Sequence, residues 1–256
     1  MSTSTSQTKS ISLKAYGITS DTVHYQLPAD ELHRITIEKG MGREADSGAL
    51  AVETGEFTGR SPKDRFIVKD DITADRVWWG DINIPFEPAA FDRLYDKVVS
   101  FLSDREVYVR DCFACADPEY RMGIRVVNEY PWSNLFVYNM FIRPEAGELK
   151  RFDPEWTVIN APGFKADPAV DGTRQHNFAI LNFSRKVALI GGTGYTGEIK
   201  KGIFSALNFI LPGFRDTLPM HCSANEAVGG GNAALCAALS AAERAGNPAR
   251  RRNGVT

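Results

Sequence analysis

Three short segments of this 256-residue chain carry side chains that can bind an anion or a metal ion. The first, TGRSPKD at residues 58–64, places Arg60 in a loop where its planar guanidinium can pair with a carboxylate through two hydrogen bonds. An arginine suits a small dicarboxylic acid better than a lysine would, because lysine lacks this planar two-point geometry. Composition alone favours a turn with solvated charges, because many such loops bind nothing.

The second segment is GGTGYTGEIKKG at residues 191–202, a glycine-rich turn between a predicted strand and a predicted helix. Backbone amides at a helix start hold anions well, so the segment invites a phosphate-loop interpretation. A nucleotide-binding P-loop has the spacing GxxxxGK[ST], and the sequence contains no such string. The segment is therefore not predicted to bind ATP in that way.

Lys200 and Lys201 follow this turn and lie about 100 degrees apart around a helix, so they cannot share one face. At most one of them points into a site. Without further context, two solvated lysines are the favoured interpretation. The helix dipole disfavours cations at this position unless an anionic group compensates.

The third segment is MHCSAN, which contains His221 among small residues. A single histidine is usually structural or solvated, and as a metal ligand it needs companions such as carboxylates or a neutral amine. His24, His33 and His176 receive no role. The three segments share a position at the margin of a predicted strand or helix, where binding sites form.

Hydrophobic spacing predicts an α/β fold in which a mixed sheet with flanking helices positions these segments. Residues 88–104 have apolar side chains at helical spacing, and residues 196–212 form a second helix that Pro212 is expected to end. Residues 119–142 leave helix and strand unresolved. Short runs rich in strand-forming residues occupy 48–55, 65–70, 106–114, 156–162, 177–183 and 186–192, the last two predicted to pair through Ser184 and Arg185.

The overall composition excludes several classes of partner. The formal net charge is -2, so no global field attracts nucleic acid or an anionic membrane. The first ten residues are polar, and no apolar run reaches membrane-spanning length, which favours a cytoplasmic protein. Four cysteines are expected to be reduced structural thiols, although Cys112 and Cys115 form a CxxC that leaves a small zinc or redox module as a minor alternative.

The segments TGEFTGRSPKDRFIV, NMFIRP, IGGTGYTGEIKKGIFSALNFILP and MHCSAN together resemble ATP-dependent phosphoenolpyruvate carboxykinase, from about SLKAYGIT to Asn225. The resemblance implies a lyase that decarboxylates oxaloacetate and uses ATP to form phosphoenolpyruvate, CO2 and ADP in gluconeogenesis. It implies Mn2+ as the cofactor and ATP as the co-substrate. Mg2+ is a further expected ion, bound together with ATP. It further implies a monomer without nucleic-acid or membrane partners.

The resemblance also implies a role for individual residues. Arg60 holds the substrate, Tyr195 lies against it, and Lys201 contacts both substrate and metal, so Arg60 and Lys201 are the expected catalytic residues. His221 is a further metal ligand, and Lys201 and His221 also lie where ATP binds. Lys200 is expected to turn away. A lysine beside a divalent cation must be neutral, which requires a lowered pKa.

The end of the sequence departs from the family. We expect residues 1–217 to form the carboxykinase N-terminal substrate domain and residues 218–225 to begin the nucleotide and metal domain, which is otherwise missing. Residues 226–256 are rich in Ala, Gly and Arg and resemble a frameshifted or truncated product, poorly ordered, with at most a short Ala-rich helix. The chain is thus expected to be an inactive fragment, and the alternative is a non-catalytic dicarboxylate-binding fragment.

Overall fold

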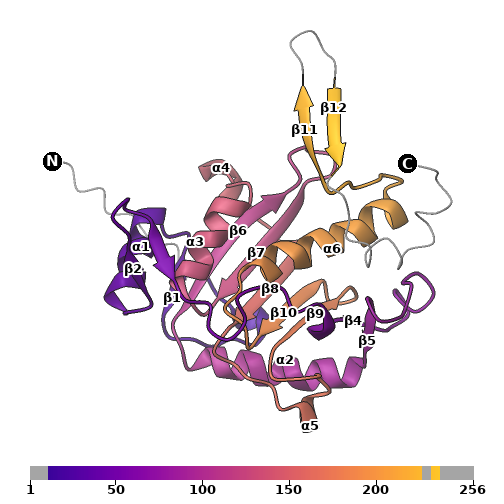
Figure 1. The fold of residues 1–256 in the computed structure, drawn as a ribbon, viewed down its shortest axis with the longest axis horizontal. Helices are drawn as coiled ribbons and strands as arrows, with labels where there is room; N and C mark the ends of the chain where they lie inside the picture. Colours follow the sequence, from indigo (N-terminus) through magenta and orange to yellow (C-terminus); the bar gives the residue numbers. More distant parts are fainter. Residues whose placement is uncertain (1–10, 227–231, 237–256) are drawn as a thin grey trace.

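An eight-stranded sheet forms the centre of the structure, a computed structural model that describes residues 11–226 and 232–236 (Figure 1). The strand order is β1-β6-β7-β8-β10-β9-β4-β5. Two neighbouring pairs, β6–β7 and β9–β10, are antiparallel, and the other five pairs are parallel, so the sheet is mixed, as predicted. Its strands are β1 (Val23–Tyr25), β4 (Arg65–Val68), β5 (Ile84–Phe86), β6 (Val107–Ala114), β7 (Met122–Asn128), β8 (Trp156–Ala161), β9 (Phe178–Asn182) and β10 (Val187–Gly191).

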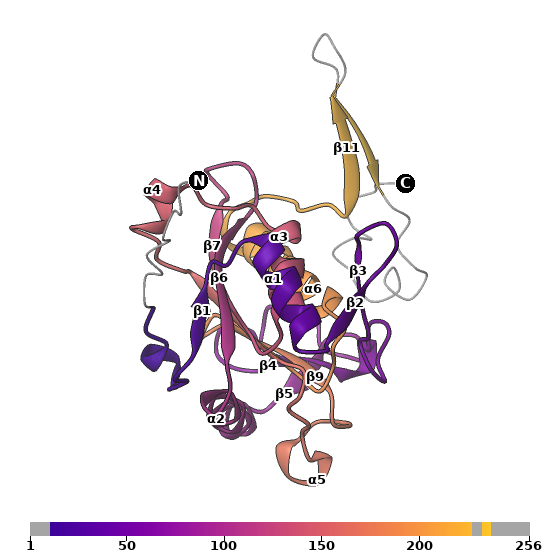
Figure 2. The ribbon, with the colours of Figure 1, turned by 90° about the vertical axis from the view of Figure 1, so that its left-hand side faces the viewer.

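Helices cover both faces of this sheet, which confirms the predicted fold class. The helix α2 (Pro88–Ser103) packs on one face, while α3 (Pro131–Met140) and α6 (Gly197–Phe214) pack on the other. Figure 2 shows α2 apart from α3 and α6, with α1 (Ala29–Glu38) beside α3. The shorter elements are η1 (Lys14–Tyr16), η2 (Pro62–Asp64), α4 (Ala146–Leu149), α5 (Pro168–Asp171), and the pairs β2 (Gly42–Glu44) with β3 (Leu50–Val52) and β11 (Cys222–Glu226) with β12 (Asn232–Cys236).

Alternation along the central strands builds two hydrophobic cores. Val126 and Val158 face α3 and α6, whereas their neighbours Val127 and Ile159 face α2. The strands β8 and β10 are buried along their whole length, as expected for strands covered on both faces. The predicted apolar side of α2 is confirmed, since all six of its members are buried: Phe91, Leu94, Tyr95, Val98, Val99 and Leu102.

The structure resolves or corrects three predictions about the elements. The ambiguous stretch 119–142 contains a strand, β7, followed by a helix, α3. The prediction that Pro212 ends the last helix was wrong, because α6 runs to Phe214 with Pro212 inside its final turn. A proline in the last turn costs the helix one backbone hydrogen bond, the bond from residue 212 to the carbonyl of residue 208, and leaves the earlier turns intact. In the Ala-rich tail, residues 232–236 are a strand rather than a helix, and the other residues from 227 onward lie outside the described part.

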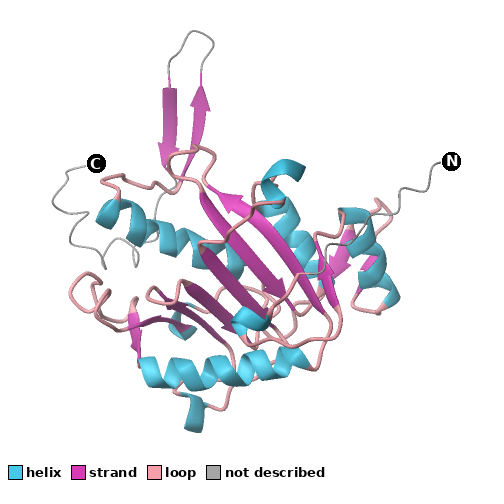
Figure 3. Cartoon of the chain, turned by 180° about the vertical axis from the view of Figure 1, so that it is seen from behind, coloured by secondary structure: helices cyan, strands magenta, loops and turns pink. Residues whose placement is uncertain are grey.

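The hairpin of β11 and β12 projects away from the sheet and its helices (Figure 3). It follows directly after His221, so one of the predicted site residues lies where the chain leaves the compact body. None of the described helices is long and apolar enough to span a membrane.

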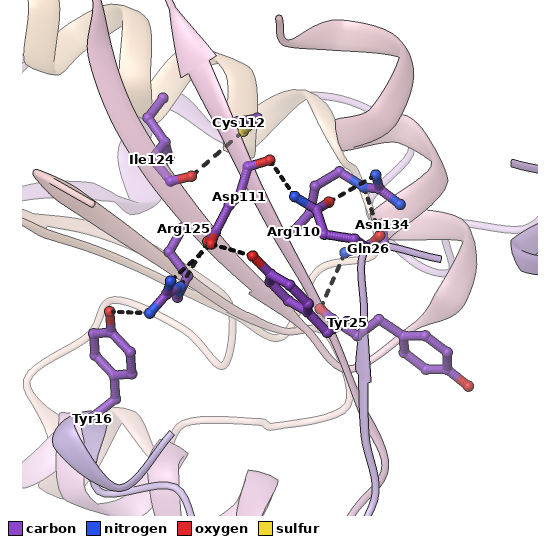
Figure 4. A network of polar contacts seen from close by, with 10 residues as sticks. Tyr16, Tyr25, Gln26, Arg110, Asp111, Cys112, Ile124, Arg125 and Asn134 are labelled. Atoms are coloured by element: carbon purple, nitrogen blue, oxygen red, sulfur yellow. Dashed lines mark hydrogen bonds and ion pairs between the residues drawn. The ribbon is translucent and has the colours of Figure 1, made fainter. Parts of the chain in front are cut away.

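A buried ion pair ties the N-terminal segment to the central sheet (Figure 4). Asp111 and Arg125 face each other across β6 and β7, and the guanidinium donates two hydrogen bonds to the carboxylate at 2.7 and 2.8 Å. Tyr25 on β1 donates to the same carboxylate at 2.8 Å, and Arg125 donates to the hydroxyl of Tyr16 at 3.3 Å. The side chain of Asp111 is fully buried, and all of its charge is compensated inside the fold.

Cys112 and Cys115 are both free thiols. Cys112 is buried in the core, and burial raises the pKa of its thiol well above the ordinary value. Burial, with a smaller contribution from Asp117, also raises the pKa of Cys115. Both thiols are therefore protonated at neutral pH, which makes them poor nucleophiles and supports the structural interpretation.

Candidate functional site

The topology of the sheet brings the first two predicted segments to one edge. The strand β4 runs parallel to β9, and β9 runs antiparallel to β10. The start of β4 therefore lies on the same side as the end of β10. Residues 58–64 lead into β4 and residues 192–196 follow β10, so the Arg60 loop and the glycine-rich turn adjoin.

Glycines allow the turn after β10 to pack closely against its neighbours. A side chain at Gly194 would approach the carbonyl oxygen of Thr54 to 2.8 Å, which places this turn directly against the segment that leads to Arg60. A side chain at Gly197 would meet the ring of Tyr195 at 2.4 Å. The first residue of α6 thus leaves space for the tyrosine ring, and the conformation of Tyr195 depends on that absence of a side chain.

Helix α6 presents one face to the Arg60 loop through residues spaced at helical intervals. Glu198 and Ser205 lie seven residues apart, with Lys201 between them on the same face. The backbone amide of Ser61 approaches Glu198 Oε1 at 3.4 Å. Arg65 spans the face, since its Nε lies 3.4 Å from Glu198 Oε2 and its Nη2 donates to Ser205 Oγ at 3.0 Å. The loop is therefore docked onto the helix that carries Lys201.

A second carboxylate, Asp64, holds the same part of the loop, between Ser61 and Arg65. Asp64 is buried and accepts two hydrogen bonds from Arg174, at 2.8 and 2.7 Å, and one from Gln175 at 2.7 Å. Arg60 therefore lies between two anchored points, Ser61 and Asp64 on one side and the close packing of Thr54 on the other. Its own side chain is half-buried.

The structure brings Lys201 and His221 into contact, although they lie twenty residues apart in the sequence. Lys201 Nζ is 3.4 Å from His221 Nε2. The ring of Phe204 packs against both, with its centroid 5.1 Å from Lys201 Nζ and 5.5 Å from the imidazole centroid. Lys200 is exposed, whereas Lys201 is half-buried, in agreement with the prediction that the two do not share a face.

The two nitrogen atoms are suitably spaced to bind one cation. Ligands at right angles, each about 2.1 Å from a metal ion, are about 3 Å apart. The observed 3.4 Å between Lys201 Nζ and His221 Nε2 is close to that separation. The described residues contain no cluster of three or more His, Cys, Asp or Glu side chains able to hold a metal, so further ligands would have to come from substrate, water or another part of the protein.

A surface pocket of about 470 Å³ opens near this edge, between α1, β3 and α3, and reaches Thr196. Trp132, Leu135 and Phe136 supply apolar walls, and His33 lies among them. Neither Arg60 nor Lys201 lines this pocket, so it is separate from the residues predicted to act on substrate.

Sequence reasoning missed the residues that hold the site together. Glu198 is buried in the first turn of α6, where its negative charge offsets the cationic lysines near the helix start. The sequence did contain a signal for Glu198, because two lysines near a helix start require an anionic group to compensate the helix dipole. The clamp on Asp64 had no comparable signal, because Arg174 and Gln175 lie 110 and 111 residues away along the chain.

Comparison with known proteins identifies the family. A family model described as phosphoenolpyruvate carboxykinase matches residues 21–245, and so extends past Asn225, where we expected the resemblance to end. Phosphoenolpyruvate carboxykinase (ATP) of Christiangramia forsetii is 71% identical over 218 residues, which cover 85% of this chain and 41% of that protein. The Flavobacterium johnsoniae protein of the same name is 70% identical over 217 residues, with the same two coverages.

A more distant relative gives the same result. Phosphoenolpyruvate carboxykinase (ATP) of Geobacillus kaustophilus is 52% identical over 204 residues, covering 79% of this chain and 38% of that protein. The chain spans about two fifths of the length of the curated relatives that it matches, and corresponds to their N-terminal portion. On the family match and these identities, the chain belongs to the phosphoenolpyruvate carboxykinase family.

Proposed function

We propose that this chain carries the residues that hold the dicarboxylate substrate and a divalent cation in an ATP-dependent phosphoenolpyruvate carboxykinase. That enzyme would convert oxaloacetate and ATP to phosphoenolpyruvate, CO2 and ADP in gluconeogenesis. The observation that carries the proposal is the 3.4 Å approach of Lys201 to His221, which gives two nitrogen ligands from separate segments at a spacing suited to one ion. The family membership supports the same assignment.

Arg60 is proposed to bind a carboxylate of the substrate. Its loop is fixed at Ser61 and at Asp64, so the guanidinium is held at the sheet edge with little freedom to lose on binding. Tyr195 lies at the same edge, on the turn that packs against Thr54, and is proposed to lie against the substrate. These two residues would orient oxaloacetate so that the departing carboxylate and the enolate oxygen have fixed positions.

Lys201 is proposed to contact both the substrate and the metal, and His221 to complete the protein's share of the ligand set. A bound Mn2+ or Mg2+ would supply positive charge that stabilises the enolate oxygen. Lys201 would bind the ion as a neutral amine after releasing its proton to solvent, and the ring of Phe204 lies against both Lys201 and His221. ATP contact by Lys201 and His221, Mn2+ as the preferred ion and a monomeric state stay predictions from the resemblance, and a cytoplasmic location stays a prediction from the sequence composition.

For the 256-residue chain by itself, we favour the alternative function, which is binding of a dicarboxylate without turnover. Phosphoryl transfer depends on positioning ATP, and the sequence contains no GxxxxGK[ST] loop to do so.

A turnover assay on the purified chain, with oxaloacetate, ATP and Mn2+, tests this proposal alongside calorimetric titration with oxalate, a planar dicarboxylate. We expect oxalate binding and no phosphoenolpyruvate. Turnover would contradict the non-catalytic assignment, and the absence of oxalate binding would contradict the substrate-binding role.

A further inference from the structure

The buried carboxylate of Glu198 occupies an unusual place between the two halves of the proposed site. It lies in the first turn of α6, three residues after Tyr195 and three before Lys201. Only 4% of its side chain is exposed. Burying a carboxylate so completely is unfavourable unless charged or hydrogen-bonding groups compensate, so its partners indicate why it is there.

Both partners of Glu198 lie on the segment that carries Arg60. One carboxylate oxygen faces the amide of Ser61, the residue next to Arg60, at 3.4 Å. The other faces Arg65 Nε, also at 3.4 Å, at the point where this segment enters β4. The carboxylate thus bridges two points on either side of the η2 turn and joins them to α6.

The same helix face carries Lys201. Glu198, Lys201 and Ser205 follow one another at three- and four-residue intervals, and Arg65 reaches from Glu198 to Ser205 across that face. Any movement of the Arg60 loop relative to α6 would therefore have to break the contacts of Glu198. Arg60 and Lys201 act on the same substrate in the proposed function, so their separation matters more than the position of either one.

We infer that Glu198 is a positioning residue, which sets the distance between the carboxylate-binding Arg60 and the metal-contacting Lys201. This inference rests on the proposed function. Glu198 itself contacts neither substrate nor metal. Removing Glu198 should keep both Arg60 and Lys201 but no longer fix the distance between them. A ligand that needs both residues should then bind more weakly.

The test uses the purified 256-residue chain and titrates oxalate in the presence of Mn2+ by calorimetry. Glu198→Ala should weaken oxalate binding about tenfold, the lower end of what is lost when a supporting residue is removed from a metal site. Hydrogen exchange at residues 57–64 should become faster in the same variant. Glu198→Gln keeps an oxygen for the Ser61 amide but loses the charge that faces Arg65, so it should fall between Glu198→Ala and the unmodified chain.

The matched control is Ser205→Ala, which removes the hydrogen bond that Arg65 donates to Ser205 and leaves the Ser61 contact intact. It should bind oxalate nearly as well as the unmodified chain. A purely structural role would lower the free energy of unfolding of Glu198→Ala without weakening oxalate binding, and that result would overturn the inference. If Glu198→Ala does not fold, unchanged binding in Glu198→Gln would overturn it equally.

The outcomes separate this inference from the function on which it rests. Oxalate binding by the unmodified chain that persists at full strength in Glu198→Ala contradicts the inference alone. An unmodified chain that fails to bind oxalate contradicts the proposed function, and the inference with it.

Discussion

Two arginine–carboxylate pairs in this molecule use the same chemistry with different geometry. In the centre of the sheet, Arg125 and Asp111 form two short hydrogen bonds at 2.7 and 2.8 Å, and Tyr25 adds a third (Figure 4). At the proposed site, Arg65 and Glu198 approach only to 3.4 Å. The central pair joins neighbouring strands that the sheet already holds together, whereas the site pair joins a loop to a helix.

The difference shows what each pair contributes. A buried pair with complete hydrogen bonding is rigid, and breaking it leaves a charge without compensation. The longer contact of Arg65 with Glu198 contributes less to stability, and its effect is to fix where the loop lies relative to α6. We therefore expect the central pair to determine the stability of the fold and the site pair to determine the spacing of the binding groups.

The largest predicted effect is on the central pair. Asp111→Ala should lower the free energy of unfolding by about 3–5 kcal/mol, because it leaves the buried charge of Arg125 unpaired. Urea denaturation measures this loss. The matched control is Asp92→Ala, which removes the exposed partner of Arg185 and should change the stability by less than about 1 kcal/mol. Equal losses of unfolding free energy in the two variants would contradict the prediction that the buried ion pair stabilises the fold more than the exposed one.

The next effect concerns ligand binding rather than stability. Arg60→Ala should weaken oxalate binding by about 1.5–3 kcal/mol for each charge-assisted hydrogen bond lost, and should disturb stability far less than Asp111→Ala. Calorimetry and urea denaturation of the same preparation give both values. Arg60→Lys keeps the charge but not the planar fork, so it should recover only part of the affinity. Full recovery by lysine would contradict two-point recognition of a carboxylate.

A smaller effect separates the two adjacent lysines. Lys201→Ala should weaken Mn2+ binding about tenfold, since it removes one of the two nitrogen atoms that lie 3.4 Å apart. Lys200→Ala removes the same side chain from an exposed position and should leave Mn2+ affinity unchanged. Electron paramagnetic resonance of free Mn2+ measures both. Equal weakening would indicate a general charge effect and not ligation.

The smallest predicted effect is a pH dependence of stability at Glu129, a buried carboxyl that has one amide and one arginine nearby. Burial raises the pKa of this carboxyl, although the amide of Gly163 donates to it at 2.7 Å and Arg105 approaches to 3.6 Å. The folded state therefore keeps the proton to higher pH than the unfolded state. The stability contributed by this group is full below its unfolded pKa and falls as the pH rises through the folded pKa.

Glu129→Gln removes that dependence and retains an oxygen for the amide of Gly163. The variant should gain stability relative to the unmodified chain as the pH rises from about 4 to about 7. Urea denaturation at several pH values checks the slope. A difference that does not change with pH would show that Arg105 compensates the buried charge fully.

The sequence predicted the parts of this molecule that depend on local patterns. The helix over residues 88–104 and the pairing of β9 with β10 were predictable, because apolar spacing and a short connection are local signals. The stop at Pro212 was predicted wrongly, since a proline in the final turn of a helix removes only one backbone hydrogen bond and leaves the preceding turns intact. The order of eight strands depends on contacts between distant segments, for which a single sequence carries no local signal.

The same distinction applies to the candidate site. Arg60, Tyr195, Lys201 and His221 were singled out from the segments and the resemblance, and the contact of Lys201 with His221 was seen only in three dimensions. Asp64 was missed because its partners lie more than a hundred residues away, and Glu198 was missed although the dipole argument called for an anionic group near the lysines. Local patterns therefore indicate the groups that act on ligands better than they indicate the groups that hold them.

The central claim is that Arg60, Lys201 and His221 belong to one site, and the binding of Mn2+ with and without oxalate tests it most directly. We predict that oxalate tightens Mn2+ binding to the 256-residue chain, and that Arg60→Ala abolishes this tightening while leaving the binding of Mn2+ alone unchanged, as reciprocal coupling within one site requires. Mn2+ binding that is indifferent to oxalate, or tightening that survives in Arg60→Ala, would contradict the claim.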